Sequence, residues 1–141
     1  MAKEEITPSE WQIMEVLWAW GEPMTSSQVY REMQGKVDMS QRMVRVLMNR
    51  LSQKGILGYT VDECDLRVYH YFVQRSREEC VKEKSRKFVD SYFSGNGTNA
   101  MAALLQSFAL TNEQIQELEE ILEKSRDRSQ ESQDKEGGAH A

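Results

Sequence analysis

Residues 40–55 read SQRMVRVLMNRLSQKG, and this stretch decides the fold. Its apolar residues recur at i, i+3, i+4 and i+7, which places them on one face of an α-helix and gives that face a core to pack on. These residues are Val44, Leu47, Met48 and Leu51. Gly55 follows and predicts the end of the helix.

The other faces of this predicted helix are basic and polar. The stretch holds four basic residues and no acidic one, although the whole chain has a formal net charge of −5. A basic face that also offers hydrogen bonds suits the DNA major groove, while the alternative is a cationic face that touches only water. The candidate DNA-contact residues on these faces are Arg42, Met43, Arg45, Val46, Asn49 and Arg50.

The composition predicts a soluble globular protein. A chain of 141 residues, with 39% hydrophobic and 29% charged residues, suits one or two small domains. Because no apolar run approaches the ~20 residues of a membrane span and the polar N-terminus is no signal peptide, we expect a cytoplasmic protein without membrane contact. Cys64 and Cys80 are too few for a disulfide framework and lack zinc-site spacing. We therefore expect no metal and no cofactor.

Two helices are predicted before the basic helix. Residues 7–10, TPSE, have the form of a capping box with proline at the first helical position, and Gly21 predicts the end of that helix. Residues 25–28, TSSQ, begin a shorter helix that Gly35 closes. Two helices joined by a short glycine-containing connection, the second basic on its exposed side, form a helix-turn-helix. This context favours DNA binding over a merely solvated face.

A β-hairpin is predicted directly after the basic helix. Residues 56–61 and 67–73 are rich in β-branched and aromatic residues, with a polar break between them. A hairpin at this place is the wing of a winged helix, and Arg67 is its candidate DNA contact. The acidic residues of the break would repel DNA, so we expect the wing to add little affinity. Ordinary structural roles for Cys64 and His70 are favoured over a metal or redox role, because further ligands at usable spacing are missing.

Amphipathic helices are predicted after residue 76. Residues 95–97, GNG, break the first of them, and residues 111–114, TNEQ, begin the last. Such helices do not easily close a core alone, so we expect their apolar faces to pair with a second copy; folding back onto the wing domain is the alternative. The candidate dimer-contact residues are Met101, Leu104, Leu105, Phe108, Ile115, Leu118, Ile121 and Leu122.

The predicted architecture is mainly α with a small β-hairpin wing. A winged helix-turn-helix domain is expected over residues 1–75, a helical dimerisation region over residues 76–124, and a disordered polar tail over residues 125–141. We expect no enzyme and no catalytic residues, because the chain lacks a GxGxxG motif, a P-loop and a Ser-His-Asp spacing that stands out.

Four motifs carry a resemblance to a known family. They are SEWQIM at residues 9–14, VLW at 16–18, VRVLMNRL at 44–51 and KGIL at 54–57. As a set they resemble the penicillinase repressor family of BlaI, MecI and CopY, over about residues 5–124. The resemblance implies a bacterial homodimeric winged-helix repressor that binds a palindromic DNA operator and is released by an inducing signal.

The resemblance also implies roles for single residues. The groove-reading positions of the family fall on Arg42, Met43 and Val46, and Arg45 falls on a phosphate contact. Ser40 matches a serine at the helix start that can also meet a phosphate.

This chain departs from the family pattern in three places. The family often has threonine at the positions of Met43 and Val46, so here apolar contact, for instance with a thymine methyl, replaces hydroxyl hydrogen bonds. The family's Asn-Phe cleavage position corresponds to Ala103-Leu104, and the tail lacks the cysteine motif of the copper-responsive members. The sequence therefore supports neither an inducer-linked protease nor a copper signal.

A second function class is a winged-helix dimer that binds a protein instead of DNA. The acidic wing and the negative net charge motivate it. The cluster of Arg42, Arg45 and Arg50 without acidic neighbours argues against it, because a protein-interaction surface has no need of such a cluster.

Overall fold

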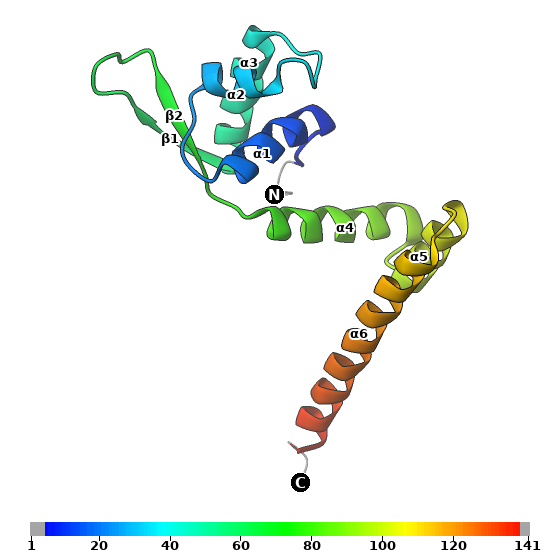
Figure 1. The fold of residues 1–141 in the computed structure, drawn as a ribbon. Coiled ribbons are helices and arrows are strands. Elements are labelled where there is room, and N and C mark those ends of the chain that lie inside the picture. The colour runs from blue at the N-terminus through cyan, green and yellow to red at the C-terminus, as the bar shows by residue number, and fades with distance from the viewer. Residues whose placement is uncertain (1–4, 139–141) are drawn as a thin grey trace. The chain divides into compact units, whose positions relative to one another are not determined.

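The computed structural model describes residues 5–138, with side chains described to residue 132. Its elements, shown in Figure 1, are α1 (Pro8–Trp20), α2 (Ser26–Met33), α3 (Gln41–Gln53), β1 (Leu57–Val61), β2 (Tyr69–Val73), α4 (Arg77–Phe93), α5 (Gly97–Ser107) and α6 (Asn112–Gly138). The predicted fold class, mainly helical with one β-hairpin after the third helix, is confirmed. The chain divides into two compact units, Met1–Phe88 and Val89–Ala141.

The predicted helix starts are confirmed by their caps. Thr7 and Glu10 form a reciprocal capping box at α1, and Thr25 and Gln28 form another at α2. The Ser40 hydroxyl accepts the N–H of the third residue of α3 at 3.1 Å. These caps satisfy backbone N–H groups that would otherwise lack a partner at a helix start.

The core of the first unit lies between α1, α2, α3 and the base of the hairpin. All four residues of the predicted apolar stripe of α3 are buried. They pack with apolar side chains of the other elements, and the main contributors are Ile13, Met14, Leu17, Val29, Met33, Ile56, Leu57 and Tyr71. Burial of one stripe leaves the other faces of α3 in solvent, which is the arrangement that groove reading requires.

The hairpin is antiparallel and anchored at its base. Its register pairs Leu57 with Val73 and Val61 with Tyr69. The second strand begins at Tyr69, two residues later than predicted, because Val68 closes a turn onto Asp65 with an N–H to O distance of 3.0 Å. A single bridge between Met24 and Tyr71 ties the connection before α2 to β2.

The first unit extends further than the predicted boundary at residue 75, because the start of α4 belongs to it. Cys80 is buried in the core cluster, and the Trp18 indole donates a hydrogen bond to the Arg75 carbonyl at 3.0 Å. Arg77 pairs with Glu15 of α1 at 3.0 Å. Side chains from the first turns of α4 therefore complete the winged-helix core.

The second unit consists of helices with little core of their own. Ser94 and Gly95 adopt left-handed backbone conformations and end α4, as the break at residues 95–97 predicts. Residues 125–138, expected to be a disordered tail, instead continue α6. No glycine or proline interrupts this segment before residue 137, and its Glu, Gln, Lys and Arg residues are good helix formers. Residues 139–141 of the expected tail lie outside the described part.

Candidate DNA-binding interface

The exposed side of α3 presents the predicted contact residues together. Arg42, Met43, Arg45, Val46, Asn49 and Arg50 are all exposed. None of the three arginines forms an ion pair or side-chain hydrogen bond with any residue between 5 and 132 for which the structure describes side chains. Their charges are therefore available to a polyanion, because no carboxylate competes for them.

The start of α3 is fixed to α2 as well as capped. The Gln41 amide donates a hydrogen bond to the Ser27 hydroxyl at 3.1 Å. Ser40 accepts the Met43 N–H through its hydroxyl oxygen, which leaves the hydroxyl proton free to be donated. The predicted phosphate contact by Ser40 is thus compatible with its capping role.

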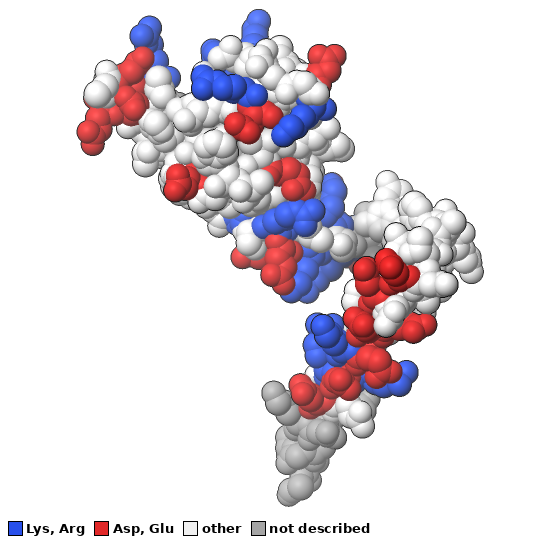
Figure 2. All heavy atoms as spheres, in the orientation of Figure 1, with Lys and Arg blue, Asp and Glu red and all other residues white. Residues whose placement is uncertain are grey.

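The wing tip is acidic, whereas the exposed side of α3 is basic. The Arg67 side chain is 91% exposed, but its Nε lies 3.1 Å from Asp65 Oδ1, so its charge is already paired. Hydrogen bonds from Arg67 lower the pKa of Asp65, and a hydrogen bond from His70 lowers the pKa of Asp62. Figure 2 shows acidic side chains gathered on the hairpin. Both carboxylates stay ionised, which weakens the case for Arg67 as a DNA contact.

Two tyrosines beside α3 form an exposed surface that was not predicted from the sequence. The rings of Tyr59 and Tyr69 stack at 4.7 Å between centroids, and the two residues are 47% and 38% exposed. Burial chiefly raises the pKa of Tyr71, and the Arg45 charge opposes that rise, so Arg45 lies close to this tyrosine cluster. The sequence could have indicated this surface, because side chains alternate between the two faces of a strand and the rings of Tyr59, Tyr69 and Tyr71 therefore lie on one face.

The remaining candidate groups do not converge on a reactive site. Cys64 is exposed and Cys80 is buried, and both are free thiols. His70 Nε2 lies 2.8 Å from Asp62 Oδ1. Within the described residues, no three His, Cys, Asp or Glu side chains gather where they could hold a metal ion. No described helix combines the length and the apolar character needed to cross a bilayer.

Comparison with known proteins places the chain in a family. The family model for the penicillinase repressor matches residues 6–124. The methicillin resistance regulatory protein MecI of Staphylococcus aureus (strain N315) is 23% identical over 120 residues, which cover 85% of this chain and 94% of MecI. The penicillinase repressor of Bacillus licheniformis is 24% identical over 127 residues, which cover 90% and 96% of the two chains. The solved DNA-binding domain of the repressor BlaI is 20% identical, with a TM-score of 0.47 and coverage of 55% of this chain and 90% of that domain.

This family consists of transcriptional repressors and not of enzymes, as the sequence analysis expected. The four motifs that carried the resemblance all lie inside the matched region. The chain therefore belongs to the penicillinase repressor family and is a DNA-binding transcriptional regulator.

Proposed function

We propose that this regulator is a homodimeric repressor that acts in the bacterial cytoplasm, binds a palindromic operator and is released by an inducing signal. The observation that carries the proposal is the exposed side of α3, where three arginines without acidic partners flank Met43 and Val46. Arginine recognises guanine or phosphate, and apolar side chains recognise the thymine methyl group. Two relatives, of Bacillus licheniformis and Staphylococcus aureus, are penicillinase repressors by name.

Five residues at the start of α3 have a proposed role, and Asn49 and Arg50 complete the exposed surface as further DNA contacts. Arg42, near the start of α3, reads a guanine in the major groove, and Met43 and Val46 contact thymine methyl groups. Arg45 and Ser40 bind phosphates and thereby fix the register of the helix on the duplex.

The test is footprinting with the purified protein on promoter DNA from its own locus, at several salt concentrations. We expect protection of a palindrome, with log affinity falling against log salt by about 0.9 per phosphate contact. Absence of specific protection at low salt would overturn the proposal and favour the protein-binding dimer.

Arg42→Ala tests the assigned base contact. We expect operator affinity to fall by about 1–3 kcal/mol, because a bidentate contact to guanine is lost. The measurement is binding of fluorescent operator duplex at fixed salt, with Arg86→Ala on α4 as a control that removes the same charge elsewhere. Equal affinities of the two variants would remove Arg42 from the readout.

The tyrosine surface gives a second prediction. In the double variant Tyr59→Phe and Tyr69→Phe, two hydroxyls that can donate to phosphate oxygens are removed while the stacked rings stay. We expect operator affinity to fall by roughly fivefold or more, because two neutral hydrogen bonds contribute about 0.5–1.5 kcal/mol each. Tyr92→Phe, which removes a hydroxyl from α4, is the control. An unchanged affinity of the double variant would exclude the tyrosine hydroxyls from the interface.

A further inference from the structure

One buried ion pair joins the end of α3 to the start of α1. Lys54 is the C-cap residue of α3, and its Nζ lies 2.7 Å from Glu10 Oε1. The Lys54 side chain is 11% exposed and that of Glu10 only 1%. The two residues are separated by 44 positions in the chain, so the contact is tertiary and not part of a local helix pattern.

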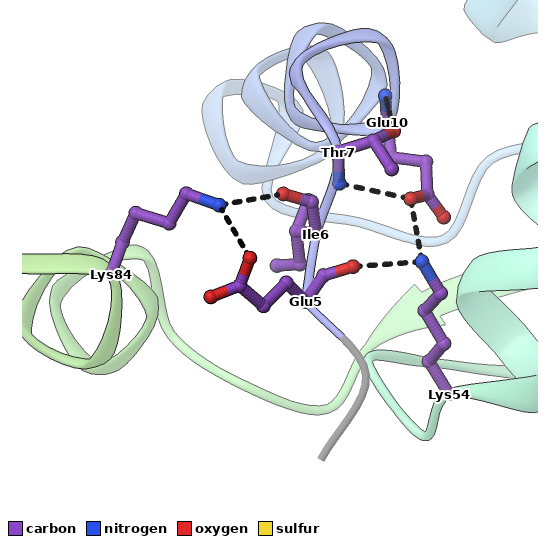
Figure 3. A network of polar contacts seen from close by, with 6 residues as sticks. All are labelled: Glu5, Ile6, Thr7, Glu10, Lys54 and Lys84. Carbon is purple, nitrogen blue, oxygen red and sulfur yellow. Dashed lines mark hydrogen bonds and ion pairs between the residues drawn. The ribbon is translucent and has the colours of Figure 1, made fainter. Parts of the chain in front are cut away.

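Both partners are themselves held in place, as Figure 3 shows. Glu10 Oε1 also accepts the Thr7 N–H at 2.9 Å as part of the capping box of α1. Lys54 Nζ donates a second hydrogen bond to the Glu5 carbonyl at 2.8 Å. The lysine is therefore fixed to the first turn of α1 and to the segment that precedes it.

Residues 5 and 6 also contact α4. Lys84 Nζ lies 3.3 Å from the Ile6 carbonyl and 3.5 Å from Glu5 Oε2. Lys87 Nζ lies 3.7 Å from Glu5 Oε1. The Glu5 carbonyl that accepts the Lys54 hydrogen bond thus belongs to a backbone segment that α4 also contacts (Figure 3).

This arrangement is costly for stability alone. Glu10 Oε2 is buried and has no hydrogen-bond partner among the described residues. Apolar side chains of similar volume often replace a buried ion pair without loss of stability, so stability does not account for a half-satisfied carboxylate here. The pair contributes a fixed orientation of α3. The apolar stripe of α3 packs without directional preference, whereas a hydrogen-bonded ion pair has a defined distance and angle.

We propose that Glu10 and Lys54 are positioning residues for operator recognition: their ion pair, with the Glu5 carbonyl, fixes the end of α3 and thereby the direction in which its exposed arginines meet the DNA. The inference rests on the proposed function of α3 as the operator-reading helix. Neither residue touches DNA itself, and both act through the orientation of α3. Contacts to base edges depend on that orientation, whereas non-specific attraction to phosphates depends mainly on charge.

The test neutralises the pair without changing the net charge. The variant combines Glu10→Gln with Lys54→Met, so that residue 10 can still accept the Thr7 N–H. The matched control combines Glu78→Gln with Lys82→Met, which neutralises an exposed i,i+4 pair on α4 in the same way. Each protein binds two duplexes of equal length and composition: the footprinted operator segment and a scrambled version of it.

We expect the Glu10/Lys54 variant to bind operator about tenfold more weakly, the effect of losing one good base contact, with scrambled-duplex affinity within about twofold of the parent. The control keeps both affinities. Equal operator affinity in the two double variants would overturn the inference while leaving the proposed function intact. Failure of the parent to distinguish operator from scrambled DNA would instead overturn the proposed function.

Circular dichroism checks that each variant is folded at the temperature of the binding assay. If the double variant is unfolded, Glu10→Gln alone replaces it, because a glutamine at residue 10 keeps a hydrogen bond to Lys54 and loses only the charge. For that variant we expect a smaller fall in the ratio of operator to scrambled affinity, and an unchanged ratio would overturn the inference.

Discussion

Leu105→Glu is expected to convert the protein to a monomer and to weaken operator binding at least about 100-fold. Leu105 lies on α5 among large apolar side chains that the second unit leaves exposed. We propose that a second copy covers these side chains, and a charge placed among them would have to be desolvated on pairing. A dimer holds two reading helices on one duplex, and this linkage typically raises affinity by 10²–10⁴ without a new contact.

The measurement combines sedimentation equilibrium with operator binding. Gln106→Glu is the matched control, because it adds the same charge to the neighbouring, exposed polar position of α5. We expect this control to stay dimeric and to keep its operator affinity. A Leu105→Glu variant that sediments as a dimer would contradict the assignment of this surface.

The apolar surface of the second unit motivates that expectation. Seven of the eight candidate dimer-contact residues are exposed and Leu118 is half-buried, whereas Ala100 is the only residue of α5 or α6 that is buried among those with described side chains. A set of this kind is larger than the scattered apolar residues of an ordinary surface and is typical of an interface. The seven exposed members are Met101, Leu104, Leu105, Phe108, Ile115, Ile121 and Leu122.

The parts of the fold that local patterns control were predictable from the sequence. The helical spacing of Val44, Leu47, Met48 and Leu51 predicted the buried stripe, and the TPSE and TSSQ segments predicted the two capping boxes. Such features depend on residues three or four positions apart, which a helix brings together by its own geometry.

The features that were not predicted depend on distant residues or on competing propensities. The stacking of Tyr59 on Tyr69 requires the register of the hairpin, which the sequence does not specify alone. Glu10 was expected only to cap α1, and its pairing with Lys54 arises from helix packing. The polar composition of residues 125–138 suggested disorder, whereas the helix propensity of the same residues continues α6.

Lys54→Met is expected to lower the free energy of unfolding of the first unit by about 3 kcal/mol at neutral pH, because it leaves the buried Glu10 carboxylate without its partner. All three tryptophans lie on α1, so tryptophan fluorescence during urea unfolding reports on this unit alone. The combined Glu10→Gln and Lys54→Met variant should recover part of the loss, because no charge then remains buried. A single variant as stable as the parent would contradict this account of the ion pair.

The same variant has a pH dependence whose sign follows from Glu10. Burial alone would raise the pKa of Glu10, but hydrogen bonds from Lys54 and Thr7 outweigh burial and hold that pKa below its ordinary value. A carboxyl group with a lowered folded-state pKa stabilises the fold above its unfolded pKa, and this stabilisation is lost as the pH falls through the folded value. In Lys54→Met the hydrogen bond and the charge of Lys54 are gone, and only the Thr7 hydrogen bonds still oppose the effect of burial. The pKa of Glu10 is therefore higher than in the parent, and Glu10 takes up a proton more readily. The stability difference between parent and variant is therefore largest at neutral pH and shrinks as the pH falls from the folded-state pKa of Glu10 in the variant to its lower folded-state pKa in the parent. In the combined variant residue 10 no longer titrates, so its loss of stability relative to the parent shrinks only as the pH falls from the unfolded pKa to the lowered folded pKa of Glu10 in the parent.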